Sequence, residues 1–383
     1  MGQDLPRTDW SRVVLLYAAG LLAAMQFAKV SLVLDDLAAI YPEEPVTFVV
    51  SAVAVVGVLA GVVAGQVVAR VGARRAILWA VAGSALASIL QATLPPFAVL
   101  MLLRLAEGAG HLALVVALPT LMAASASNSD RPVVMALWGT FFGVGFASAA
   151  LLLRVLPDAS AVLLMHGVVL AVLWPVLWRL LPATPGAAGL RAGFVASHLA
   201  VWSRARLMAP GVGHGLYTSL FIALVTFLPG ALDALWLAPL LPLTNLAGTV
   251  GAGFAAKRIA ASALVTAGFA AAAAGFALLW VTGSAWVALT TMGATGVIAG
   301  AGFAAVPWLN RDRADQARAN GGMAQLGNVG TFTGTPLLGA ALAGGGVGTM
   351  LGLAVAICVI GTVASAAVYG AARRAPTHVA PDV

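Results

Sequence analysis

Ionisable side chains lie within two of the long apolar stretches of this sequence. Lys29 lies in the first stretch, and Arg104, Glu107 and His111 lie in the fourth. Positions i, i+3 and i+7 share one face of a helix, so the second group would form a stripe with a cation, an acid and an imidazole. A charge in membrane hydrocarbon costs about 3 kcal/mol on insertion scales, so such residues indicate ion pairs, binding sites or proton paths.

The residue types suit different chemical roles. A lysine can lose its proton when it is desolvated, whereas an arginine effectively cannot, so Lys29 could titrate while Arg104 stays a fixed anchor for an anion. Glu107 and His111 can both exchange protons, and we predict that they serve proton coupling. Structural roles remain open, because Lys29 could pair with Glu107 or with Asp36 on its own helix face, and Arg104 could pair with Glu107.

The chain resembles itself at an offset of 188 positions, as between Arg70 and Arg258. The offset stays constant across four apolar stretches and predicts two related halves, a pattern found in transporters. The pairs are Gly65 with Gly253, Arg70 with Arg258, Gly108 with Gly296, Pro119 with Pro307, Met135 with Met323, and Gly139 with Gly327.

The same offset relates two polar pairs. It carries Gln26 and Lys29 onto His214 and Tyr217, so repeat-related helices would present polar groups at equivalent depth. Paired polar sites of this kind indicate a cavity between the halves. We therefore predict that Gln26, Lys29, Arg104, His214 and Tyr217 bind substrate.

The elements that position these residues must be membrane helices. Hydrophobic residues make up 61% of the chain and charged residues only 9%, against about 25% charged in soluble domains. A helix needs about 20 apolar residues to cross the hydrocarbon core, and the fold class is therefore an all-α integral membrane protein. Twelve spans are predicted, at roughly 13–38, 46–67, 76–94, 97–122, 133–156, 160–181, 207–228, 232–256, 262–282, 285–309, 320–343 and 347–370.

The net charge of +7 does not indicate a nucleic-acid partner. With the N-terminus inside, nearly all Lys and Arg fall in cytoplasmic segments, which is the positive-inside pattern. The surplus would face anionic membrane lipids. We predict an inner (plasma) membrane protein with both termini cytoplasmic. Acidic residues gather near the outer ends, at Asp35, Asp36, Glu43, Glu44, Asp158 and Asp233.

The halves are predicted to be separate bundles joined by a linker. Residues 1–181 would form an N-terminal six-helix bundle, and residues 207–383 a C-terminal six-helix bundle with a short cytoplasmic tail. Residues 182–206 are rich in Pro, Gly and basic side chains and would form a cytoplasmic linker. The single cysteine, Cys358, excludes a disulfide within the chain and a cysteine metal cluster.

The loop after the second stretch carries a motif. It reads Gly65-Gln66-Val67-Val68-Ala69-Arg70-Val71-Gly72-Ala73-Arg74-Arg75. This resembles the loop signature of the major facilitator superfamily, in which Gly65, Arg70, Gly72, Arg74 and Arg75 match and Ala69 replaces an acid. The second half holds a degenerate copy that ends in Lys257 and Arg258. The fourth stretch adds Arg104, Gly108 and Gly110, which look like another pattern of that family.

The resemblance implies two bundles around a cavity that opens alternately to either side. Helices 1, 4, 7 and 10 would line it, and the loop motif would hold one conformation through contacts between helix ends. Because Ala69 leaves Arg70 without its usual acidic neighbour, that latch would be weaker or would use another residue. The resemblance names a superfamily and no substrate.

We predict a secondary transporter that moves a small organic anion or zwitterion together with protons and acts as a monomer. An exporter of amphipathic drugs or metabolites by proton antiport is the first alternative, and a non-transporting membrane receptor or sensor is the second. Neither a Walker phosphate loop nor a metal-binding His/Glu motif occurs in the sequence. We therefore predict neither an enzyme nor a cofactor or metal.

Overall fold

The computed structural model describes residues 7–127, 129–153, 155–184, 186, 193–310 and 313–374, and all regular elements in these ranges are helices. The predicted linker 182–206 is therefore described only in part, and the tail beyond residue 374 lies outside the described residues. The predicted all-α fold, with two repeat-related bundles, is confirmed.

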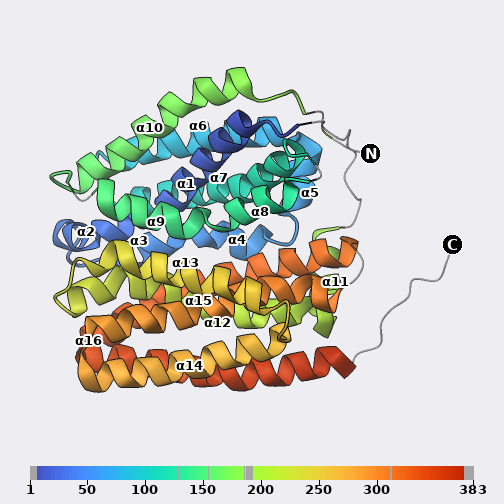
Figure 1. The fold of residues 1–383 in the computed structure, drawn as a ribbon. Helices are drawn as coiled ribbons and strands as arrows, with labels where there is room; N and C mark the ends of the chain where they lie inside the picture. The colour runs from blue at the N-terminus through green and yellow to red at the C-terminus, as the bar shows by residue number, and fades with distance from the viewer. Residues whose placement is uncertain are drawn as a thin grey trace.

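The first half runs from α1 to α10, coloured blue to green in Figure 1. Its elements are α1 (Trp10–Leu32), α2 (Leu34–Ile40), α3 (Thr47–Ser51), the short 3-10 helix η1 (Ala52–Ala54), α4 (Val55–Ala60), α5 (Ala64–Val71), α6 (Ala73–Gln91), α7 (Phe97–Ala124), α8 (Arg131–Gly139), α9 (Phe141–Leu152) and α10 (Ala159–Leu180).

The second half runs from α12 to α16, coloured yellow-green to red, and α11 (Phe194–Trp202) precedes it. Its helices are α12 (Ala205–Ala231), α13 (Leu237–Ala255), α14 (Ala261–Thr282), α15 (Ala285–Leu309) and α16 (Arg313–Arg374).

The long α16 is two helices joined at a kink. Gly346 has φ 72° and ψ −171°, values that interrupt the helix and that favour glycine. Its 62 residues would measure about 93 Å at 1.5 Å per residue, three times the hydrocarbon thickness. The chain therefore reverses at Gly346 and crosses twice.

Helix breaks also explain the number of crossings. Nine helices of the described chain are long and apolar enough to span a membrane, or up to eleven if each of two bent pairs is one span. The first bent pair joins 47–60 to 64–71 at 82°, and the second joins 133–139 to 141–152 at 48°. Counting the two arms of α16 separately gives the twelve crossings that the sequence predicts.

Local sequence sets several helix ends. Asp9 accepts a hydrogen bond from the backbone N–H of Arg12 at 3.0 Å, and Asp158 accepts one from Ala161 at 2.8 Å. Such caps satisfy N–H groups that the first helical turn leaves unpaired. Gly283 ends α14 in the left-handed conformation, as C-terminal glycines commonly do.

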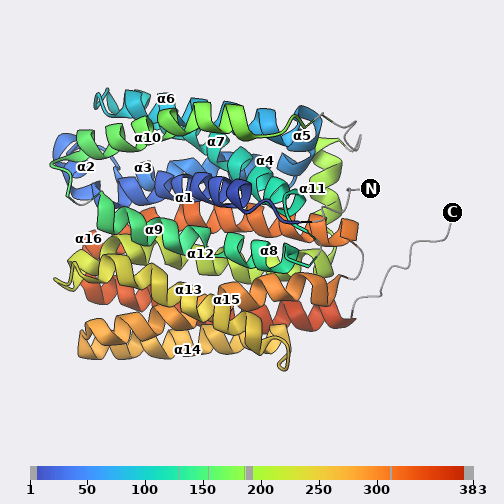
Figure 2. The same ribbon diagram turned by 45° about the horizontal axis from the view of Figure 1, so that its top comes forward.

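The main contacts between the two halves are in two places. The elements α3, η1 and α4 pack against α16, and α9 packs against α13 (Figures 1 and 2). A Cβ on Gly61 would lie 3.1 Å from backbone atoms of Gln325, so the absence of a side chain permits this approach. The amide of Gln325 donates to the carbonyl of Val58 at 2.7 Å, near the bend where α4 ends.

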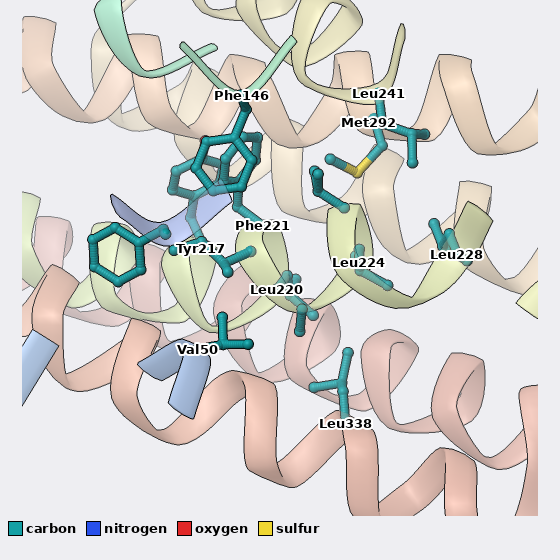
Figure 3. Close-up of a cluster of buried hydrophobic side chains, with 14 of the residues drawn as sticks. Val50, Phe146, Tyr217, Leu220, Phe221, Leu224, Leu228, Leu241, Met292 and Leu338 are labelled. Atoms are coloured by element: carbon teal, nitrogen blue, oxygen red, sulfur yellow. The ribbon is translucent and has the colours of Figure 1, made fainter. Parts of the chain in front are cut away.

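A large hydrophobic cluster crosses this boundary. Figure 3 shows Phe146 of the first half beside Phe221 and Tyr217 of the second, with Val50 and Leu338 nearby. A second cluster lies within the first half, among α1, α6, α7 and α10. The polar residues predicted from the sequence must therefore be embedded in apolar surroundings.

Candidate functional site

A buried polar cluster occupies the interior of the first half. It is built by α1, α6, α7 and α10, which pack on one another. None of its side chains is exposed by more than 8%. The members are Gln26, Lys29, Ser84, Ser88, Gln91, Arg104, Glu107, His111 and His166.

The carboxylate of Glu107 is the centre of the cluster. Its Oε1 lies 2.5 Å from the Nζ of Lys29, and its Oε2 pairs with a guanidinium nitrogen of Arg104. The amide of Gln91 donates to the same Oε2 at 2.9 Å. One acid on α7 thus joins helices α1 and α6 through charge-assisted hydrogen bonds.

Lys29 has two further polar neighbours. Its Nζ donates to the hydroxyl of Ser88 at 2.6 Å and lies 3.2 Å from Nδ1 of His166. The Nε2 of His166 lies 3.0 Å from the carbonyl oxygen of Leu22. The ammonium group is therefore held by α6, α7 and α10 together.

Arg104 ties the cluster to the backbone of neighbouring helices. Its Nε donates to the carbonyl of Val49 at 2.8 Å, and another guanidinium nitrogen donates to the carbonyl of Gln26 at 2.9 Å. Val49 belongs to α3, which packs on α16 of the other half. A change in the Arg104–Glu107 pair would therefore alter the contact of α3 with α16 at the boundary between the halves.

His111 and Gln26 form the inner end of the cluster. Nδ1 of His111 lies 3.0 Å from Oε1 of Gln26 and 3.1 Å from the carbonyl oxygen of Ala23. The amide of Gln26 donates to the hydroxyl of Ser84 at 2.8 Å. These contacts place Gln26 between α6 and α7.

The charges of the cluster do not balance. Two cations, Lys29 and Arg104, face the single carboxylate of Glu107. With neutral histidines, the cluster carries one net positive charge where no part of Lys29, Arg104 or Glu107 is exposed. The Oε1 of Gln91 has no hydrogen-bond partner. An excess buried charge is costly unless a proton leaves or an anion enters.

The second half holds a neutral network at the corresponding depth. The hydroxyl of Tyr217 donates to Oδ1 of Asn245 at 2.9 Å, and the amide of Asn245 donates to the hydroxyl of Thr295 at 2.9 Å. His214 packs against Tyr217 and Phe303, with ring centroids 5.7 and 5.3 Å away. Its Nδ1 is buried without a hydrogen-bond partner.

The structure therefore separates the predicted substrate residues into two groups. Gln26, Lys29 and Arg104 lie with the predicted proton-coupling residues Glu107 and His111 in the first half. His214 and Tyr217 lie in the second half, on α12.

A chain of aromatic contacts joins the two groups. His111 contacts Phe27 at 5.0 Å, Phe27 contacts Phe142 at 6.0 Å, Phe142 contacts Phe221 at 5.9 Å, and Phe221 contacts Tyr217 at 5.8 Å between ring centroids. The chain links helices α7, α1, α9 and α12.

Some parts of the cluster do not follow from the sequence interpretation. The polar side chains of α6, Ser84, Ser88 and Gln91, were missed, although their i, i+4 and i+7 spacing marks one helix face. The suggested pairing of Lys29 with Asp36 is wrong. Helix α1 ends at Leu32, and the chain restarts as α2, so Asp36 is exposed while Lys29 pairs with Glu107.

The loop motif covers most of α5 and the first turn of α6, with Gly72 between the two helices. Gly72 has φ 88°, and a Cβ there would collide with the carbonyl oxygen of Thr184. The side chain of Arg74 donates to the carbonyls of Trp178 and Leu181 at 2.6 and 3.0 Å. This arginine therefore binds the end of α10.

The remaining motif residues lie at the surface. Gly65, Arg70 and Arg75 are exposed, and a Cβ at Gly65 would meet no atom within 4 Å. In the second half, Lys257 and Arg258 are exposed, and the ammonium of Lys257 lies 5.2 Å from the ring centre of Phe254. In the described part of the chain, no group of three or more His, Cys, Asp or Glu side chains could hold a metal ion.

Comparison with known proteins identifies one family. The family model described as Major Facilitator Superfamily matches residues 16–310. No curated protein sequence matches the chain.

Solved structures share the fold. A bacterial homolog of the human lysosomal transporter Spinster, captured inward-facing and unoccupied, has a TM-score of 0.74 and 12% identity over 95% of this chain and 96% of its own. The human organic anion transporter MFSD10 (TETRAN) has a TM-score of 0.67 and 18% identity, over 94% of this chain and 100% of its own. The nucleoside transporter NupG has a TM-score of 0.73 and 12% identity, over 94% of this chain and 99% of its own. At these identities the likeness establishes the architecture alone.

Proposed function

The chain belongs to the major facilitator superfamily, and on that premise we propose that it moves a small organic anion or zwitterion by proton-coupled alternating access. The family and the fold of its structural neighbours make it an integral membrane transporter.

The observation that carries the proposal is the unbalanced charge of the cluster. Lys29 and Arg104 share the carboxylate of Glu107, all fully buried. An anion near Lys29 would offset the extra positive charge, so Gln26, Lys29 and Arg104 are the proposed anion-binding side. One structure with this fold is named an organic anion transporter, which agrees with the proposal without establishing it.

Proton coupling follows from competition for Glu107. When its carboxylate is charged, it pairs with both cations; when it takes a proton, both pairs weaken and the cations become available to the anion. His111 lies on the same helix and would relay the proton. Arg104 also bonds to Val49 of α3, and α3 packs on α16, so the exchange would alter the contact between the halves.

The second half would supply the other side of the substrate site. His214 has a buried ring nitrogen without a partner, and Tyr217 ends the aromatic chain that starts at Phe27. A substrate that separates the halves would displace these ring contacts and meet His214 and Tyr217. The loop motif residues Gly65, Arg70, Gly72, Arg74, Arg75, Lys257 and Arg258 are proposed to control the conformational change.

We also propose the division of the chain into bundles 1–181 and 207–383 with a cytoplasmic linker, an inner-membrane location with cytoplasmic termini, and a monomeric working unit. The basic loops support the orientation through the positive-inside rule. The helix α11 lies between the bundles at the end where α16 also terminates (Figure 2).

Export of amphipathic compounds is the second candidate. It is favoured by the aromatic contacts Phe27, Phe142 and Phe221 between the two polar groups, because aromatic rings bind apolar substrate surface well. The direction of coupling to the proton gradient distinguishes this candidate from the first.

The test is uptake by purified protein in proteoliposomes with an imposed pH gradient. With labelled carboxylates, an interior more alkaline than the bath should drive accumulation of a symported anion, and a reversed gradient should abolish it. Accumulation of cationic amphiphiles under the opposite gradient would favour the exporter. The same uptake would be measured for Glu107→Gln. Its matched control is Thr295→Val, because the repeat relates the two positions. Uptake that does not change with either direction of the pH gradient would contradict proton coupling.

A further inference from the structure

A groove opens between α14 and the last turns of α16. It encloses about 420 Å³ at the end of the molecule where α16 terminates, which the proposed topology places at the cytoplasmic surface. Its polar lining comprises Ser262, Thr266, Tyr369 and Arg373, and its apolar lining is mostly alanine, including Ala267 and Ala366.

The first half fills the corresponding place with side chains. There, Arg74 of α6 donates to the carbonyl oxygens of Trp178 and Leu181 at the end of α10. The 188-residue offset relates Arg74 to Ser262 and Trp178 to Ala366. The offset holds structurally, because α6 begins at Ala73 and α14 begins at Ala261. Small residues replace large ones in the second half, and a groove results.

The start of α14 has unmet hydrogen-bonding capacity. In the first half, the backbone N–H of Arg74 donates to the hydroxyl of Thr184 at 2.8 Å. The repeat-related residue of Thr184 is Ala372, which has no hydroxyl, and the capping residue Ala260 of α14 offers no side-chain acceptor. Unpaired N–H groups at a helix start attract anions.

A second, independent feature points to a ligand. Tyr369 lines the groove, is 1% exposed, and its hydroxyl has no hydrogen-bond partner. A buried hydroxyl without a partner costs free energy, so a bound acceptor at this place would be favourable. Arg373 is exposed at the same groove and supplies a positive charge.

We propose that this groove binds a phospholipid with an anionic head group. The head-group phosphate accepts hydrogen bonds from Arg373, from the hydroxyl of Tyr369 and from the first N–H groups of α14. An acyl chain lies along Ala263, Ala267 and Ala270 of α14. The groove continues into these alanines, which suit a hydrocarbon chain and would add nothing to the binding of a free phosphate.

The experiment measures lipid binding to the purified full chain in detergent by native mass spectrometry and by thermal unfolding. The probes are dioleoyl phosphatidylglycerol, dioleoyl phosphatidylcholine and inorganic phosphate. We expect the phosphatidylglycerol to bind and stabilise the protein, with Arg373→Gln weakening its affinity about tenfold, as for loss of one charged hydrogen bond.

Two more variants sharpen the test. Ala366→Trp restores the residue type found at Trp178 and should abolish binding by filling the groove, whereas Arg374→Ala removes a neighbouring charge that does not line it and should leave the affinity unchanged. Equal binding of both lipids, equal loss in Arg373→Gln and Arg374→Ala, or full stabilisation by inorganic phosphate alone would each overturn the proposal. Arg373 is exposed, so its variant tests the site even if Ala366→Trp fails to fold.

Discussion

The two halves have the same helix arrangement but different interiors. The first half buries Lys29, Arg104 and Glu107 in one hydrogen-bonded group. The repeat-related positions in the second half carry no charge and are just as buried. They are Tyr217 for Lys29, Phe276 for Ser88, Leu279 for Gln91, Met292 for Arg104, Thr295 for Glu107 and Ala354 for His166.

The difference shows that this architecture does not require a buried ion cluster. The second half packs the same helices with Phe276, Leu279 and Met292, each fully buried. Well-packed apolar residues often replace a buried ion pair without loss of stability. Folding alone therefore does not explain the charges of the first half, which supports their proposed role in transport.

The largest effect is expected from breaking the cluster at its centre. Glu107→Gln leaves Lys29 and Arg104 buried without a counter-charge, which should lower the free energy of unfolding by about 3 to 5 kcal/mol. Thermal and denaturant unfolding in detergent would measure it. The repeat-related Thr295→Val is the control and should cost about 0.6 kcal/mol. Equal losses in both variants would mean that the two interiors do not differ in the way proposed.

A charge placed in the second half should be tolerated poorly. Met292→Arg puts a guanidinium at the position related to Arg104 and should cost about 3 kcal/mol, the typical penalty for a charge at membrane depth. Adding Thr295→Glu recreates the i, i+3 pair of Arg104 and Glu107 and should recover part of that loss. Unfolding of the single and double variants would be compared. No recovery would indicate that the first half depends on its polar surroundings and not on the pair.

The sequence predicted the spans and the main charges of the first half, because hydropathy and helix periodicity depend on local residue order. The i, i+3 spacing of Arg104 and Glu107 sufficed to place them on one face. Periodicity does not say which neighbouring helix that face meets, so Ser88 and His166 were not assigned to the cluster. Small polar residues such as Ser84 often bond to their own helix, which makes them poor signals in an apolar sequence.

The sequence also could not predict the separation of the predicted substrate residues. The repeat placed Gln26 and Lys29 at the same depth as His214 and Tyr217, but depth along a helix does not fix its rotation about its own axis. In the structure, Lys29 is held by side chains of α6, α7 and α10. A break after Leu32 likewise removed Asp36 from the face of Lys29, although no proline or glycine marks it.

A smaller effect is expected in the neutral network. Tyr217→Phe removes the hydrogen bond to Asn245 and should lower stability by about 0.6 kcal/mol, since membrane-buried hydrogen bonds contribute modestly. If Tyr217 contacts substrate, the apparent affinity for substrate should fall by more than this stability loss explains. Uptake against substrate concentration would be measured beside unfolding. An unchanged affinity would remove Tyr217 from the proposed site.

Removing all three charges together should cost far less stability than removing Glu107 alone. In the variant Lys29→Met, Arg104→Met, Glu107→Gln, the amide keeps a partner for Gln91 while neither cation remains, so stability should return to within about 1 kcal/mol of the wild type. Proton-driven uptake should nevertheless be lost, because the carboxylate that would exchange the proton and both cations that would hold the anion are gone. Recovery of stability without recovery of uptake would assign the cluster to function. Continued instability would show that the first half needs its charges to fold. In that case the neutral interior of the second half would not be a valid model for the interior of the first.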